Sequence, residues 1–166
     1  PERLGTAAMT IGAARPALDI ATAYTTRRKA FGQPVATFQG GSFKVAESAM
    51  LMDACRSMIY TTSLAVDRGC DERLIRRLVS ESKKFVKESC QKVAEYSMQV
   101  MGGIAYTTIY PVERIVRDLR LASIWTGTNE IMSNIIAHEW YKEFFTKRAA
   151  SLARDHENDA AGSEVP

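Results

Sequence analysis

Residues 125–130, WTGTNE, place a glycine between two threonines directly before a helical pattern. A glycine turn at a helix N-terminus brings backbone N–H groups close to an anionic or strongly polar ligand. The same residues also suit a plain helix cap, in which Thr128 is the N-cap and the helix dipole favours Glu130 in the first turn. The turn is therefore a candidate ligand-binding site, with a cap as the alternative.

A second candidate site surrounds a glycine loop in RRKAFGQPVATFQ, residues 27–39. Arg28 offers an always-charged guanidinium that can bind a diphosphate through two hydrogen bonds. Its alternative role is a solvated arginine beside a helix C-terminus. Phe31 and Gln39 lie in the same stretch, where they also suit a loop anchor and a helix cap.

A third candidate is the double glycine of QVMGG, residues 99–103, at the end of a long helical pattern. Gly102 and Gly103 lack a Cβ, so a ligand can approach the backbone closely there. An ordinary helix C-cap is the alternative.

Helices must position these candidates, because apolar residues return at helical intervals and no stretch alternates like a strand. Pro16 should bend the first helix. We expect helices at residues 2–30, 43–66, 72–101, 112–121 and 129–152, with a loop at 31–39. This pattern predicts an all-α fold, an antiparallel up-and-down four-helix bundle with an extra short helix. Residues 1–150 should form this domain, and residues 151–166 should be a disordered tail.

Composition excludes several classes of protein. The net charge of +3 over 166 residues forms no basic stripe, so we expect no nucleic-acid partner. The three cysteines show no CxxC spacing and the two histidines pair with no second ligand, so we expect no metal site. The sequence contains no apolar run of membrane-spanning length and no signal-peptide core at its start, which favours a cytoplasmic protein.

Four motifs, RRKAFGQPVATFQ, QVMGGIAY, YPVERIVRD and IWTGTNEIM, occur in this order. Together they resemble the C-terminal helical domain of the flavin-dependent acyl-CoA dehydrogenases, over about residues 2–145. The resemblance implies FAD as cofactor and oxidation of an acyl-CoA substrate to the trans-2-enoyl-CoA. It also implies electron-transfer flavoprotein as electron acceptor and a homo-oligomer, either dimer or tetramer.

The resemblance assigns most candidates to the cofactor. Arg28 matches the arginine that reaches the FAD of a neighbouring subunit. The resemblance implies that Phe31 packs against the adenine region and that Gln39 hydrogen-bonds the cofactor. It implies that Gln99, Gly102 and Gly103 approach the adenosine part. The residues implied beside the flavin are Thr128, Asn129 and Glu130. Ala105 replaces the usual third glycine, so contact beyond Gly103 is not carried over.

Many members of the family carry the catalytic glutamate directly before the Gly-Thr of the turn, where this chain has Thr126. A threonine hydroxyl has too high a pKa to act as the base. Isovaleryl-CoA and long-chain acyl-CoA dehydrogenases instead carry the glutamate in an ERL sequence opening the first helix. The chain begins PERL, so Glu2 matches the base and Arg3 a residue near the substrate, while Thr126 and Gly127 would line the thioester side. The alternative for Glu2 is a favourable charge in a first helical turn.

The family places a helical domain and a β-domain before this one, and nothing in the sequence could build a β-domain. We therefore expect a domain of a longer enzyme, or a remnant, that does not turn over substrate alone. One alternative is a non-catalytic bundle kept for oligomer assembly or partner binding, against which Glu2 and Arg28 together argue. Another is a related flavoenzyme such as a nitroalkane oxidase.

Overall fold

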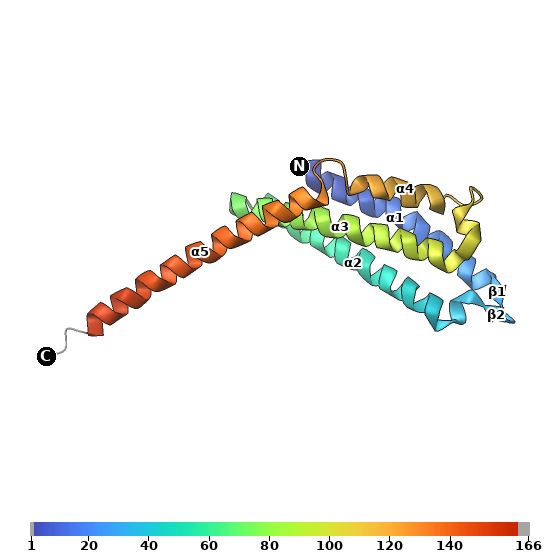
Figure 1. The fold of residues 1–166 in the computed structure, drawn as a ribbon, viewed down its shortest axis with the longest axis horizontal. Helices are drawn as coiled ribbons and strands as arrows, with labels where there is room; N and C mark the ends of the chain where they lie inside the picture. The colour runs from blue at the N-terminus through green and yellow to red at the C-terminus, as the bar shows by residue number, and fades with distance from the viewer. Residues whose placement is uncertain (1, 163–166) are drawn as a thin grey trace.

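The computed structural model describes residues 2–162, and side chains through Ser151. Five α-helices make up most of this part of the chain, as the all-α prediction requires (Figure 1). They are α1 (Glu2–Arg27), α2 (Gln39–Asp67), α3 (Glu72–Met101), α4 (Val112–Ala122) and α5 (Asn129–Gly162). In the described residues, no helix combines the length and apolar character needed to cross a membrane.

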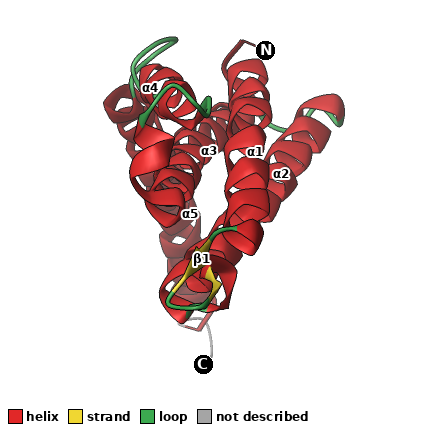
Figure 2. Ribbon diagram, turned by 90° about the vertical axis from the view of Figure 1, so that its right-hand side faces the viewer, coloured by secondary structure: helices red, strands yellow, loops and turns green. Residues whose placement is uncertain are grey.

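Helix α3 lies at the centre, in contact with all four other helices (Figures 1 and 2). Helices α1, α2, α3 and α4 alternate in direction, so the ends of the bundle collect residues far apart in sequence (Figure 1). Small side chains on α1, among them Ala7, Ala14 and Ala17, are fully buried against the other helices. Such residues let neighbouring helices approach closely while larger side chains such as Val86 and Val93 fill the core.

The bounds of α3 agree with the prediction, because both ends carry strong local signals. At the start, the Asp71 carboxylate accepts hydrogen bonds from the backbone N–H groups of Arg73 and Leu74, at 3.0 and 3.1 Å. At the end, Gly102 has φ +73°, a conformation that glycine adopts without strain and that stops a helix. A 3₁₀ helix, η2 (Gly102–Tyr106), follows directly.

Two predicted boundaries near the first loop are wrong. Helix α1 ends at Arg27, because the chain then forms a two-stranded hairpin of β1 (Lys29–Ala30) and β2 (Gln33–Pro34), where no strand was expected. Phe31 and Gly32 form the tip of the hairpin. Their φ angles of +50° and +84° are those of a type I′ turn, in which both central residues have positive φ. A 3₁₀ helix, η1 (Val35–Thr37), leads onward.

Helix α2 begins at Gln39, earlier than the predicted residue 43. Gly40 and Gly41 have low helix propensity and obscured this start in the sequence. Gln39 is therefore the first residue of the helix rather than a loop residue or a cap. The N-cap is Phe38, which makes no side-chain capping bond.

Helix α5 begins at Asn129 as predicted, and the Ile131 N–H donates to the Thr128 hydroxyl at 3.3 Å, which confirms Thr128 as a cap. The first part of α5 packs on α3 and the remainder projects away from the bundle (Figure 1). The helix continues through Gly162, across much of the expected tail at 151–166, and residues 163–166 lie outside the described residues.

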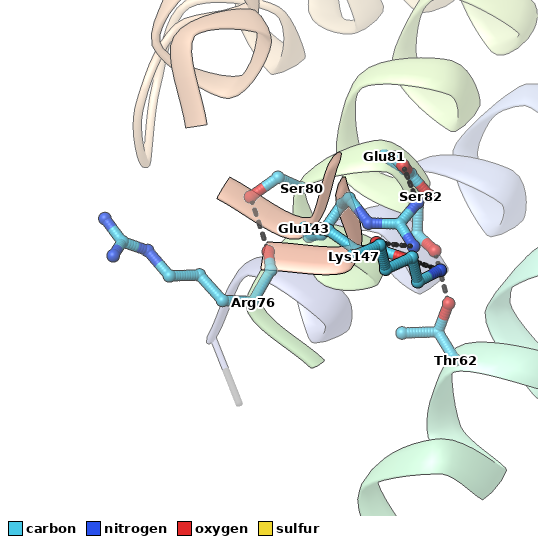
Figure 3. A network of polar contacts seen from close by, with 8 residues as sticks. Thr62, Arg76, Ser80, Glu81, Ser82, Glu143 and Lys147 are labelled. Carbon is cyan, nitrogen blue, oxygen red and sulfur yellow. Dashed lines mark hydrogen bonds and ion pairs between the residues drawn. The ribbon is translucent and has the colours of Figure 1, made fainter. Parts of the chain in front are cut away.

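Polar contacts fix α3 to both α5 and α2 (Figure 3). The Arg77 guanidinium donates to Glu81 at 3.0 Å and to Glu143 of α5 at 3.3 Å. On another face of α3, the hydroxyls of Ser82 and Thr62 lie 2.7 Å apart and join it to α2.

Candidate functional site

The start of α1 meets the turn at residues 123–128 beside α3. Gly127 has φ +95°, and a Cβ placed there would lie 3.0 Å from Met132 Cε and 3.9 Å from a guanidinium nitrogen of Arg3. Arg3 therefore reaches the turn from the first turn of α1. Glu2 is exposed beside it, and both residues line an open groove along α3. The structure thus brings together the residues predicted to face the substrate, from opposite ends of the sequence.

Lys83 of α3 holds this turn in place. Its side chain is fully buried, and Nζ donates to the carbonyl oxygens of Trp125 at 3.0 Å and Thr126 at 2.9 Å, and also to that of Gly127. An ammonium group has three N–H donors, so these three carbonyl groups use all of them. Burial lowers the pKa of Lys83, and the interaction with the Lys87 side chain opposes this shift. Among the nearby charges, Arg3 lowers the pKa and Glu2 raises it.

Thr126 adopts φ +52°, which is uncommon for any residue except glycine and strained for a β-branched one. Its hydroxyl is buried and has no hydrogen-bond partner among the described residues. Strained backbone of this kind persists where surrounding contacts impose it, and such sites are often functional. Here Lys83 supplies the imposing contact.

Lys87 follows Lys83 by one helical turn and is 1 % exposed. Burial, and then the charge of Lys83, lowers the pKa of Lys87 to about 7. Its Nζ has no hydrogen-bond partner within the described part of the chain. A lysine with this pKa exchanges its proton near neutral pH, so the local charge can change there.

The residues predicted to lie beside the flavin follow directly after the turn. The Asn129 side chain is buried, and its Nδ2 donates to Glu88 Oε1 at 3.3 Å. Glu130 is exposed, and hydrogen bonds from its own backbone N–H and from the Thr128 hydroxyl lower its pKa. With Lys87 these residues line a groove of about 240 Å³.

The other predicted cofactor residues gather at the opposite end of the bundle, where α1 and α3 end (Figure 1). The side chains of Arg28, Gln39 and Gln99 are exposed and have no hydrogen-bond or ion-pair partner among the residues described. Phe31, at the hairpin tip, is 96 % exposed and touches the ring of Phe38 edge-on. Gly102 and Gly103 are exposed as well, with open space where a Cβ would stand.

The sequence analysis missed Lys83 and Lys87. A signal for them was present, since positions 83, 87, 90 and 94 recur at helical spacing and Cys90 and Ala94 are core residues. A lysine at helical spacing from such core residues lies on the buried face of the helix.

The fold and the turn define a helical-bundle domain that offers a polar site at one end and an outward-facing hairpin at the other. The chain belongs to the acyl-CoA dehydrogenase family, because the family model described as "Acyl-CoA dehydrogenase, C-terminal domain" matches residues 1–140.

Individual relatives agree with this membership. The probable acyl-CoA dehydrogenase FadE25 of Mycobacterium tuberculosis is 38% identical over 130 residues, which are 78% of this chain and 33% of that protein. The caffeyl-CoA reductase-Etf complex subunit CarC of Acetobacterium woodii is 33% identical over 135 residues, or 81% of this chain and 35% of CarC. The structure of butyryl-CoA dehydrogenase from Megasphaera elsdenii superimposes with a TM-score of 0.79 at 30% identity, covering 84% of this chain and 36% of that one. The chain therefore spans about a third of the length of its relatives.

Proposed function

We propose that this chain works as the C-terminal domain, residues 1–150, of a flavin-dependent enzyme that oxidises an acyl-CoA thioester to the trans-2-enoyl-CoA. The observation that carries the proposal is the meeting of α1 with the turn, where Arg3 approaches Gly127. Glu2 lies one residue before Arg3 and would remove the α-proton of the thioester. Thr126 and Gly127 would line the thioester side, with the turn held by Lys83.

FAD fits the residues present. The exposed, unpaired guanidinium of Arg28 suits a diphosphate, and the bare backbone at Gly102 and Gly103 leaves room for an adenosine group. Phe31, Gln39 and Gln99 would complete this part, while Thr128, Asn129 and Glu130 would lie beside the flavin. When bound, the flavin accepts the β-hydride of the substrate.

The two groups of cofactor residues lie at opposite ends of a helix that is ~39 Å long at 1.5 Å per residue. This separation supports a homo-oligomer in which Arg28 reaches the cofactor of another subunit. Exposed apolar side chains at the same end, such as Phe31, Tyr106 and Ile109, support it too.

Electron-transfer flavoprotein is the proposed electron acceptor, since the name of CarC places that relative in a complex with Etf. The free thiols of Cys55 and Cys90 are buried, as suits the reducing cytoplasm that we propose as its location.

The test is Glu2→Gln in the full gene product that contains this chain, with acyl-CoA added anaerobically and the flavin absorbance followed by stopped flow. Flavin reduction should become at least a hundredfold slower with the FAD content unchanged. An unchanged rate would remove Glu2 from the mechanism. If the full product neither binds FAD nor reduces it, the non-catalytic bundle is the correct alternative.

A further inference from the structure

The core between α2 and α3 contains two cysteines that the proposed reaction does not use. Cys55 of α2 and Cys90 of α3 are both 0% exposed and belong to the same cluster of buried apolar residues. Both thiols are free, and the third cysteine of the sequence, Cys70, lies half-buried in the turn between the two helices. Two reactive groups are therefore enclosed together between one pair of helices.

The two buried thiols interact directly with each other. A hydrogen bond with the Cys90 side chain lowers the pKa of Cys55 against the opposing effect of burial, and a hydrogen bond with the Ser89 side chain lowers it further. The contact with Cys55, together with burial, raises the pKa of Cys90. The Cys90 thiol is therefore the donor of this pair, and Cys55 carries the sulfur that ionises first.

The surroundings of the pair suit a covalent bond across the helix interface. A disulfide requires two side chains that point towards each other from closely packed backbone segments, and the hydrogen bond between the thiols shows that these two do so. Met52 lies one turn before Cys55, and Val86 and Val93 lie on either side of Cys90. These three side chains are at most 2% exposed, so the pair lies inside the interface rather than at its rim.

We propose that Cys55 and Cys90 form a redox-active pair, which a peroxide oxidises to a disulfide bond between α2 and α3. Burial keeps a large thiol such as glutathione away from both sulfurs. Hydrogen peroxide is little larger than a water molecule, and it can reach the pair during brief local openings of the native state. The inference needs neither FAD nor dehydrogenase activity.

The reaction takes two steps. The Cys55 thiolate attacks one oxygen of hydrogen peroxide, so that an S–O bond forms, the O–O bond breaks and the released hydroxide takes up the Cys55 proton as water. The Cys90 sulfur then attacks the sulfur of the Cys55 sulfenic acid, so that the S–S bond forms and the S–O bond breaks. The hydroxyl group leaves with the Cys90 proton as a second water. The two thiols thus lose two electrons and two protons, and the peroxide is reduced to water.

The test uses the full chain with Cys70→Ser, so that only the pair remains. The reduced protein is treated with hydrogen peroxide in native buffer, unfolded in the presence of an alkylating agent, and digested for mass spectrometry. Both cysteines should escape alkylation, and the digest should contain one peptide that joins Cys55 to Cys90 and lacks two hydrogen atoms. Dithiothreitol should restore alkylation of both. Full alkylation of both cysteines after peroxide, or a linked peptide that joins two different chains, overturns the proposal.

Two variants in the same background serve as matched controls. In Cys90→Ala the reaction should stop after its first step, so Cys55 should be trapped as a sulfenic acid by dimedone. In Cys55→Ala the attacking thiolate is missing, so Cys90 should remain alkylatable at the peroxide exposure that converts the pair. Oxidation of Cys90 in Cys55→Ala as fast as in the intact pair would show that the two thiols do not act together, and would overturn the proposal.

A second measurement places the bond in the native core. A disulfide between Cys55 and Cys90 closes a loop that contains the turn between α2 and α3, and such a cross-link restricts the unfolded chain. The melting temperature, followed by circular dichroism, should therefore rise by about 5 °C or more after oxidation and return after dithiothreitol. A linked chain that melts at a lower temperature than the reduced one, or that has lost helical signal, overturns the native α2–α3 bond.

Discussion

At the end of the bundle where α1 begins, contacts within the chain hold the candidate residues in place. Lys83 binds the carbonyl oxygens of residues 125–127, and Arg3 approaches the same turn. At the other end, the side chains of Arg28 and Gln99 are exposed and unpaired within the described residues. The turn end is preorganised by one chain, whereas the hairpin end presents groups for something outside it. Changes at the two ends should therefore have different consequences.

The largest effect should come from the proposed base at the turn end. Glu2→Gln in the full gene product keeps the size and hydrogen-bonding capacity of the side chain but cannot accept a proton. We expect flavin reduction by acyl-CoA to fall by roughly three orders of magnitude, equivalent to about 4 kcal/mol, as measured by stopped flow. Thr126→Glu in the same background should restore part of the rate by placing a carboxylate at the turn. A normal rate of flavin reduction in Glu2→Gln alone would show that Glu2 is not the base.

Loss of the Lys83 contacts should be next in size. Lys83→Met fills the same volume but leaves three carbonyl groups without their donor, so we expect the free energy of unfolding to fall by about 3 kcal/mol. Urea unfolding measures this change, and amide hydrogen exchange should rise most at residues 125–128. Lys92→Met is the control, with an expected change under about 1 kcal/mol because Lys92 forms an exposed pair with Glu47. Equal losses in both variants would show that Lys83 has no special role.

Lys87→Met should act in the opposite direction and stabilise the chain. The pKa of Lys87 is about 7 in the folded state and near its ordinary value of 10.5 in the unfolded state. The cost of burying its charge is therefore complete below pH 7 and declines as pH rises towards 10.5, because the folded protein then releases a proton that the unfolded chain keeps. We expect a gain of about 2 kcal/mol at pH 6 and roughly half of that at pH 9, measured by urea unfolding without added anions. A gain independent of pH would contradict this assignment of charge.

The smallest effect on stability should be at the hairpin end. Arg28→Gln removes an exposed guanidinium with no partner in the described residues, so the free energy of unfolding should change by less than about 0.5 kcal/mol. In the full gene product the same variant should lose FAD, measured as flavin absorbance per mole of protein. A large stability loss with normal FAD content would reverse the contrast between the two ends.

The sequence predicted the fold best where local signals were strong. Gly102 predicted the end of α3, and Thr128 predicted the start of α5. The start of α2 was missed because Gly40 and Gly41 have low helix propensity. The hairpin at Phe31 and Gly32 was missed because its two-residue strands are too short to show an alternating pattern in the sequence.

The candidate site was predictable in part. The family resemblance predicted Glu2 and the turn as parts of one site, and their approach to each other depends on the packing of α1 against α3. Lys83 and Lys87 were missed because lysine is ordinarily a surface residue. The burial of Lys83 also depends on carbonyl groups more than forty positions further along the chain.

The left-handed backbone at Thr126 has an evolutionary consequence. A β-branched residue is the more strained choice at φ +52°, so an unbranched glutamate would be tolerated there at least as well as threonine. The loop thus needs no remodelling for a carboxylate to migrate between the start of α1 and this turn. Under the proposed mechanism, a lineage could carry an acid at both positions and then lose either one without rebuilding the turn.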